Sequence, residues 1–188
     1  MPRKADPLLE DTILRAARKL WTRGGEKSLS LRAVARAANT NTPAIYRRFR
    51  NKTEILRALV RTVQQELFEA LQTCNSLQEI GEKTLDFGLA HPREYLLLTS
   101  GLLSRIGEPQ PNLEFAKRKS AEWLGGTPEE HNRLVLASWC LVHGTAMLLI
   151  TKTVPRGSEK EMRAGFARAL ETLSREEAVF RNAKRIRG

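Results

Sequence analysis

The chain is 188 residues long, 41% of them hydrophobic, and carries a formal net charge of +11 at pH 7. The length and the hydrophobic content are ordinary for a globular protein whose core lies in one or two units. No repeat or low-complexity segment appears. Residues 1–60 hold 14 Lys and Arg against 5 Asp and Glu, whereas the other 128 residues hold 18 against 16. Such asymmetry indicates a polyanion-binding part joined to a nearly neutral body, although charge alone would favour a solvated basic surface.

The basic part predicts an amphipathic helix followed by a pair of short helices. The first helix covers residues 13–21 on apolar spacing and stops at Gly24. Residues 31–38 repeat the spacing of a helix with one apolar face, and Ser30 is placed to cap its start. Asn39 then stands where the chain must turn, and Asn tolerates the left-handed conformation better than most residues.

The second helix of the pair is predicted over residues 42–49. Pro43 falls in its first turn, where a missing N–H costs nothing, and Ile45 and Phe49 give it an apolar back. Its front is small, polar and cationic, which suits the major groove of DNA. Because this pattern coincides with the positive charge, a helix-turn-helix is favoured over a plain basic surface. The residues of that front are Thr42, Tyr46, Arg47, Arg48 and Arg50.

At these residues the sequence resembles the TetR family of bacterial transcriptional repressors. The resemblance spans roughly the first fifty residues: the first helix, the turn pair, a Tyr-x-x-Phe motif at residues 46–49, and the following Lys52. Asn39 stands where the family usually has glycine, and Arg48 where it often has histidine. Beyond about residue 70 the resemblance rests on size and helical architecture. The resemblance implies a DNA-binding repressor that responds to a small ligand.

The expected DNA contacts divide into base-reading and phosphate-binding residues. Arg32, by family position and by lying on a polar helix face, is expected to reach a base edge or a phosphate. Thr42, Pro43 and Ala44 are expected to form the leading tip, with Ala44 touching a thymine methyl group. The other contacts are expected to be with phosphates, one of them beside a helix N-terminus that favours an anion. These are Tyr46, Arg47, Arg48 and Lys52.

The expected fold class is all-α, with about nine helices, because no run shows sustained strand alternation. A three-helix helix-turn-helix DNA-binding domain is expected over residues 1–54, and a helical ligand-sensing and dimerisation bundle over residues 55–188. A capping-box variant at residues 51–54 opens a long helix that reaches about Leu71. The tail from Arg175 is expected to be a frayed end. The other predicted helices cover residues 77–90, 92–106, 113–124, 128–150 and 158–174.

The segment 134–150 contains no Lys, Arg, Asp or Glu. At 17 residues it is short of a convincing membrane span, so it predicts a helix buried on most sides and no membrane partner. One small bundle supplies too little cover for such a helix. A homodimer is therefore predicted through the helices near residues 128–152 and 158–174, against the alternative of a monomeric bundle with this helix at its centre.

An effector pocket inside the C-terminal bundle is implied by the resemblance. Few polar groups in an apolar pocket would suit a hydrophobic or aromatic effector, with His143 as the best polar candidate. Each candidate has a competing role in core packing. The candidate lining residues are Phe87, Tyr95, Trp123, Trp139, His143 and Met147.

No catalytic or metal-binding motif appears, so no enzyme activity, cofactor or metal is expected. Cys74 and Cys140 are expected to be reduced, buried thiols in a cytosolic protein, and the first residues lack the apolar stretch of a signal peptide. The sequence favours a dimeric repressor that a small apolar or aromatic ligand releases from a palindromic operator. The alternatives are a helical interaction protein whose basic head binds nucleic acid or membrane without sequence choice and, less favoured, an enzyme that uses the C-terminal cavity.

Overall fold

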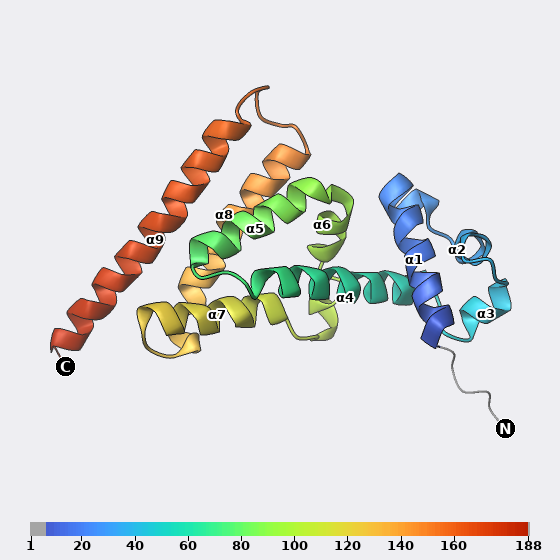
Figure 1. Ribbon diagram of the computed structural model, residues 1–188, viewed down its shortest axis with the longest axis horizontal. Helices are drawn as coiled ribbons and strands as arrows, with labels where there is room; N and C mark the ends of the chain where they lie inside the picture. The colour runs from blue at the N-terminus through green and yellow to red at the C-terminus, as the bar shows by residue number, and fades with distance from the viewer. Residues whose placement is uncertain (1–6, 188) are drawn as a thin grey trace. The chain divides into compact units, whose positions relative to one another are not determined.

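The computed structural model describes the backbone of residues 7–187 and the side chains of residues 8–103 and 105–178. Over these residues the protein is all-α, with nine α-helices, three short 3-10 helices and no strand, which confirms the predicted fold class (Figure 1). The chain forms two compact units. Met1–Gln65 with Arg93–Glu108 is called here the head unit, and Glu66–Pro92 with Pro109–Gly188 the body unit. The functional boundary expected at residue 54 remains a prediction.

The head unit is built around one apolar core to which every one of its longer helices contributes. Ile13, Val34 and Ile45 are completely buried, and so is Ile55 at the start of the long helix. Leu97, although far away in sequence, belongs to the same core. The helices of this unit are α1 (Pro7–Gly24), η1 (Gly25–Ser28), α2 (Leu31–Ala37), α3 (Thr42–Tyr46), the first part of α4 (Lys52–Leu71), α6 (Pro92–Leu98) and η2 (Ser104–Ile106).

The body unit is a bundle in which α5, α8 and α9 pack against one another and α7 contacts all three. Local signals set its helix starts: the Ser76 hydroxyl accepts a hydrogen bond from the Glu79 amide at 3.1 Å, at the first turn of α5. A capping box formed by Thr127 and Glu130 opens a 3-10 turn before α8. The helices are α5 (Leu77–Ala90), α7 (Pro111–Leu124), η3 (Pro128–His131), α8 (Asn132–Ile150) and α9 (Glu159–Arg187), together with the end of α4.

Gly81 lets α5 and α9 approach closely. A Cβ atom at this position would collide with Leu170 and would lie 3.1 Å from the Phe166 ring, and both side chains are buried. We expect Gly81→Ala to lower the free energy of unfolding by about 1–3 kcal/mol, despite the better helix propensity of Ala, because the core has no room to adjust. Chemical denaturation would measure this loss, and an unchanged or higher stability would contradict the close packing.

Two helix ends differ from the prediction. α6 ends at Leu98 rather than near residue 106, because the chain turns through Gly101, whose φ of 74° lies in the left-handed region. α9 continues to Arg187, through the tail that was expected to fray. That tail has neither glycine nor proline before its last residue, so nothing local stops the helix.

The sequence predicted that α8 is buried on most sides, and this prediction is wrong. The buried side chains of α8 form one stripe, represented by Leu134, Val142 and Ala146. Beside this stripe Trp139 is still 44% exposed, and on the opposite side Cys140 is exposed, which corrects the expectation of a buried Cys140 thiol; Cys74 is buried as expected. Hydrophobic patterning alone does not distinguish a face covered by its own chain from a face left open.

Candidate DNA-binding surface

The first helix of the reading pair, α2, is fixed at both ends by local contacts. The Ser30 hydroxyl accepts a hydrogen bond from the Ala33 amide at 3.1 Å, as predicted for the cap. After α2 the chain reverses through Asn39, whose φ is 50°, and the Thr40 amide donates to the Ala35 carbonyl at 2.9 Å. Asn39 closes the turn in the left-handed conformation, which glycine would adopt at a lower conformational free energy.

The second helix, α3, is shorter than predicted. It begins after Asn41, whose side-chain oxygen accepts a hydrogen bond from the Ala44 amide at 2.9 Å. It ends at Tyr46 rather than residue 49, because the Arg48 amide turns to the Ile45 carbonyl at 2.9 Å. That tighter turn places Phe49 in the core, with only 5% of it exposed.

Most of the predicted contact residues of the helix pair have exposed or half-buried side chains in the structure. Tyr46 is 56% exposed, although it is a large aromatic residue. Ala44 is the exception: only 3% of it is exposed, so the structure argues against the predicted contact with a thymine methyl group. The exposed members are Arg32, Pro43, Tyr46 and Arg47, and Thr42 and Arg48 are half-buried.

Lys52, the last predicted phosphate contact, lies at the N-terminus of α4. The Asn51 side chain caps this helix by accepting from the Glu54 amide at 3.0 Å, and the Glu54 carboxylate accepts from the Arg50 amide at 2.6 Å. The Lys52 ammonium donates to the Glu26 carboxylate at 2.9 Å, and this hydrogen bond and charge lower the pKa of Glu26. Sequence reasoning missed Glu26, because no local pattern links residues so far apart in the chain.

Residues 13–59 match the bacterial regulatory proteins of the tetR family. This segment is a TetR-family DNA-binding domain. The match begins in α1 and ends within α4, so it covers the whole of α2, the turn and α3. The comparison of the sequence with curated proteins finds no match.

Solved structures extend the TetR-family likeness over nearly the whole chain. A TetR variant from Acinetobacter baumannii AYE, solved with minocycline, has 21% identity and a TM-score of 0.65 over 89% of this chain and 94% of its own. A TetR regulator from Streptomyces coelicolor has 20% identity and a TM-score of 0.69, over 90% and 97%. The multidrug binding protein EbrR, solved with imidazole, has 18% identity and a TM-score of 0.63, over 92% and 93%. At such identities the likeness establishes the fold, which is that of a TetR-family transcriptional regulator.

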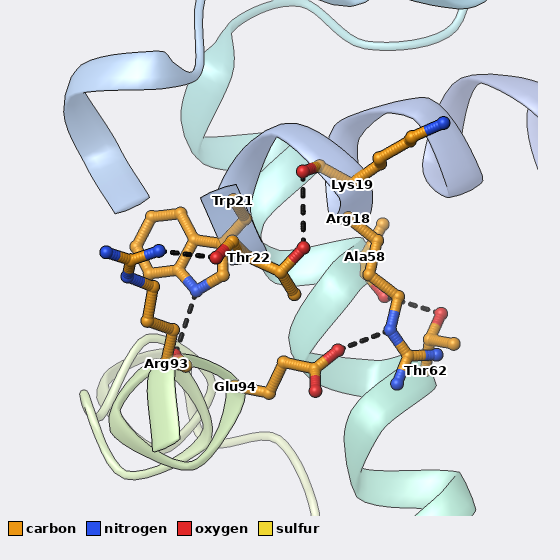
Figure 2. Close-up of polar contacts among 8 residues, drawn as sticks. All are labelled: Arg18, Lys19, Trp21, Thr22, Ala58, Thr62, Arg93 and Glu94. Atoms are coloured by element: carbon orange, nitrogen blue, oxygen red, sulfur yellow. Dashed lines mark hydrogen bonds and ion pairs between the residues drawn. The ribbon is translucent and has the colours of Figure 1, made fainter. Parts of the chain in front are cut away.

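An ion pair and two hydrogen bonds hold α6 to α1 within the head unit (Figure 2). The Glu94 carboxylate is buried and forms an ion pair with Arg18 of α1. The Trp21 indole donates to the Arg93 carbonyl at 2.8 Å, and the Arg93 guanidinium donates to the carbonyl of Thr22 in the last turn of α1. The head unit therefore includes a second chain segment, Arg93–Glu108, which follows α5 of the body unit in sequence.

The six predicted ligand-lining residues are not brought together around one described cavity. Tyr95 belongs to the head unit, where burial raises its pKa to about 12 and keeps the phenol neutral. Trp139 of α8 is 44% exposed, and its ring centre lies 6.4 Å from that of His143. The other members, Phe87, Trp123 and Met147, are half-buried in the body unit. Their role in ligand binding remains a prediction.

The exposed side of α8 borders an open groove between α8 and α9, with a volume of about 760 Å³. Leu136, Cys140, Gly144 and Leu148 are exposed at intervals of four residues along that side. No charged residue interrupts α8 from Leu134 to its end. Such a continuous apolar surface is typical of a face that another protein surface covers. The groove is lined by Ala137, Cys140, Leu141, Gly165, Arg168, Ala169, Thr172 and Leu173.

Proposed function

We propose that the protein is a cytoplasmic transcriptional repressor that binds a palindromic operator as a homodimer and leaves it when a small apolar or aromatic ligand binds. The observation that carries the proposal is the exposed cationic surface of a TetR-type helix-turn-helix. A binder that uses charge alone has no need of a capped, five-residue helix with Thr42 and Pro43 at its tip. Such a tip can approach base edges closely.

The proposed DNA contacts follow the exposure of the side chains. Thr42 and Pro43 at the start of α3 read base edges, with Arg32 of α2 reaching a base or a phosphate. The remaining contacts are with phosphates, whose neutralisation releases counterions and makes binding steeply dependent on salt. The phosphate contacts are Tyr46, Arg47, Arg48 and Lys52.

The proposed dimer uses the helices near residues 128–152 and 158–174. Two glycines on this surface support it: Gly144 in α8 and Gly165 in α9 lie inside helices, and a Cβ atom at either position would meet nothing within 4 Å. Glycine lowers helix stability by about 1 kcal/mol relative to Ala. Within the single chain this cost has no structural reason, because no neighbouring atom would clash with a side chain at either position. The absence of side chains at both glycines would let a helix of the partner chain pack closely against them. A dimer with two-fold symmetry would then bind an operator with two-fold symmetry.

By length and composition alone, Pro128–Ile150 is also apolar enough to cross a membrane. Its buried stripe, however, packs within the body unit, where α8 contacts α5 and α9. A helix with one side in its own bundle and the other side apolar fits a protein partner of similar shape. For this reason the proposal assigns the exposed side to a second copy of the chain rather than to lipid.

The ligand is proposed to bind in the body unit and to favour one separation of the two heads over another, since equal affinity for both would shift nothing. Two neighbouring structures hold small organic molecules, minocycline and imidazole, which supports a ligand-responsive body. The chain passes between the two units three times: within α4, at the first residues of α6, and between Glu108 and Pro109 before α7. The proposed lining residues in the body unit are Phe87, Trp123, Trp139, His143 and Met147; Tyr95 lies in the head unit and is not part of this proposal.

Ligand release is tested by screening apolar and aromatic compounds for stabilisation of the protein, then titrating each binder into the protein–operator complex. A typical coupling of about 1–3 kcal/mol predicts that a saturating ligand weakens operator binding roughly 5–150-fold. Met147→Ala should weaken ligand binding, whereas Leu8→Ala, on an exposed residue of α1, should not. A saturating binder that leaves operator affinity unchanged would contradict ligand release.

A further inference from the structure

Glu26 and Lys52 form an ion pair at the edge of the proposed DNA surface. Glu26 lies in η1, directly after α1, and its carboxylate accepts a hydrogen bond from the Lys52 ammonium at 2.9 Å. The Glu26 side chain is 71% exposed and the Lys52 side chain 36% exposed, so solvent and ligands can reach both. The same ammonium is proposed above to contact a DNA phosphate.

We propose that Glu26 competes with the DNA backbone for Lys52 and thereby lowers the affinity of the head unit for all DNA sequences alike. The inference rests on the proposed function, because it requires that Lys52 binds a phosphate. Glu26 is then a residue that sets the strength of DNA binding without touching a base.

The competition follows from the charges and distances. An ammonium group has three donors, and Glu26 occupies one of them. A phosphate oxygen at hydrogen-bond distance from the same ammonium would lie within about 6 Å of the carboxylate. That separation is shorter than the Debye length at physiological salt, so repulsion between the two anions is only partly screened.

The pair weakens DNA binding rather than preventing it. Exposed Lys–Glu pairs are weak, because each charge remains solvated and the long side chains lose freedom when they pair. Arg47 and the N-terminus of α4 also attract phosphate, so DNA can displace the carboxylate. In a unit with so large an excess of positive charge, this contact limits binding to unrelated DNA, to which phosphate contacts contribute most.

The test is Glu26→Gln in the full chain, since Gln keeps the shape and a hydrogen-bond acceptor but removes the charge. We expect DNA binding about threefold tighter per head, and about tenfold tighter for a two-headed complex, from the loss of repulsion at this distance. The gain should be equal on the selected operator and on a scrambled duplex. The dependence of affinity on salt should also steepen, because Lys52 then replaces counterions more completely. Fluorescence anisotropy at several salt concentrations measures both quantities.

Two further variants make the result specific. Glu122→Gln removes the same charge from a comparable Lys–Glu pair in the body unit, in which Lys119 donates at 2.6 Å, and it should leave DNA affinity unchanged. In a Lys52→Gln background, Glu26→Gln should give less than half its original gain. Unchanged or weaker binding by Glu26→Gln, or an undiminished gain without Lys52, overturns the inference. If the parent protein binds no duplex, the proposed function fails instead.

Discussion

Gly165→Glu is expected to convert the protein from a dimer to a monomer while the fold of the single chain is preserved. The position is exposed within α9, and a side chain there meets nothing in its own chain. Replacing a helical glycine should raise helix stability by about 0.5 kcal/mol. In the dimer, however, the symmetric interface would bury two unpaired carboxylates, which should weaken association by on the order of 100-fold or more. Sedimentation equilibrium at micromolar concentration measures the association state.

Ala164→Glu is the matched control for this change. Ala164 is exposed on the same helix, one residue earlier, but does not line the groove. It should remain dimeric, and thermal unfolding should show that both variants are folded. The exposed Cys140 thiol provides a second measurement, because dimerisation should slow its alkylation in the parent and not in Gly165→Glu. A parent chain that is monomeric at micromolar concentration would contradict the dimer and the palindromic operator together.

Arg47→Glu is expected to weaken binding to every DNA sequence by about 100-fold or more at low salt. The residue is exposed next to the end of α3, and the change places a negative charge where a phosphate is proposed to bind, once in each head. The dependence of affinity on salt should also flatten, by about one unit of slope for each phosphate that the variant no longer neutralises. Arg118→Glu makes the same charge change on an exposed residue of the body unit and should have little effect.

Thr42→Ala should behave differently from Arg47→Glu, because it changes the tip that is proposed to read bases. We expect it to weaken operator binding about 5–100-fold, the usual range for one base contact, and to leave a scrambled duplex nearly unaffected. Anisotropy titrations on both duplexes separate the two roles. Equal losses on operator and scrambled DNA for Thr42→Ala would end the assignment of base reading to the tip.

The sequence predicted the helix pair of the head unit well, because the signals that specify it are local. The Ser30 cap, the turn at Asn39 and the apolar spacing of α2 depend only on neighbouring residues, and all are confirmed. The burial of Ala44 could not be predicted in the same way, since it depends on the angle at which α3 packs on the core. Similarly, the tight turn that ends α3 early places Phe49 in the core, and this packing is a tertiary effect.

Local patterns in a single sequence could not predict contacts between segments that are far apart in the chain. Nothing local pairs Glu26 with Lys52, or assigns the chain near Glu94 to the same unit as α1. For α8, the uncharged sequence predicted a helix buried on most sides, and the structure shows that this is wrong for the single chain. The same sequence could not show that a large part of the helix surface is left open by the single chain.

Selection of bound duplexes from a random DNA library tests the central claim most directly, since it asks whether the head unit reads sequence at all. The account predicts recovery of one inverted repeat, with two equal half-sites that match a two-fold dimer. It also predicts that Thr42→Ala selects altered half-sites, while Glu26→Gln selects the same ones. Recovery of no common sequence, with binding that follows phosphate density and salt alone, would contradict the account. A basic head that binds nucleic acid or membrane without sequence choice would then be the better description.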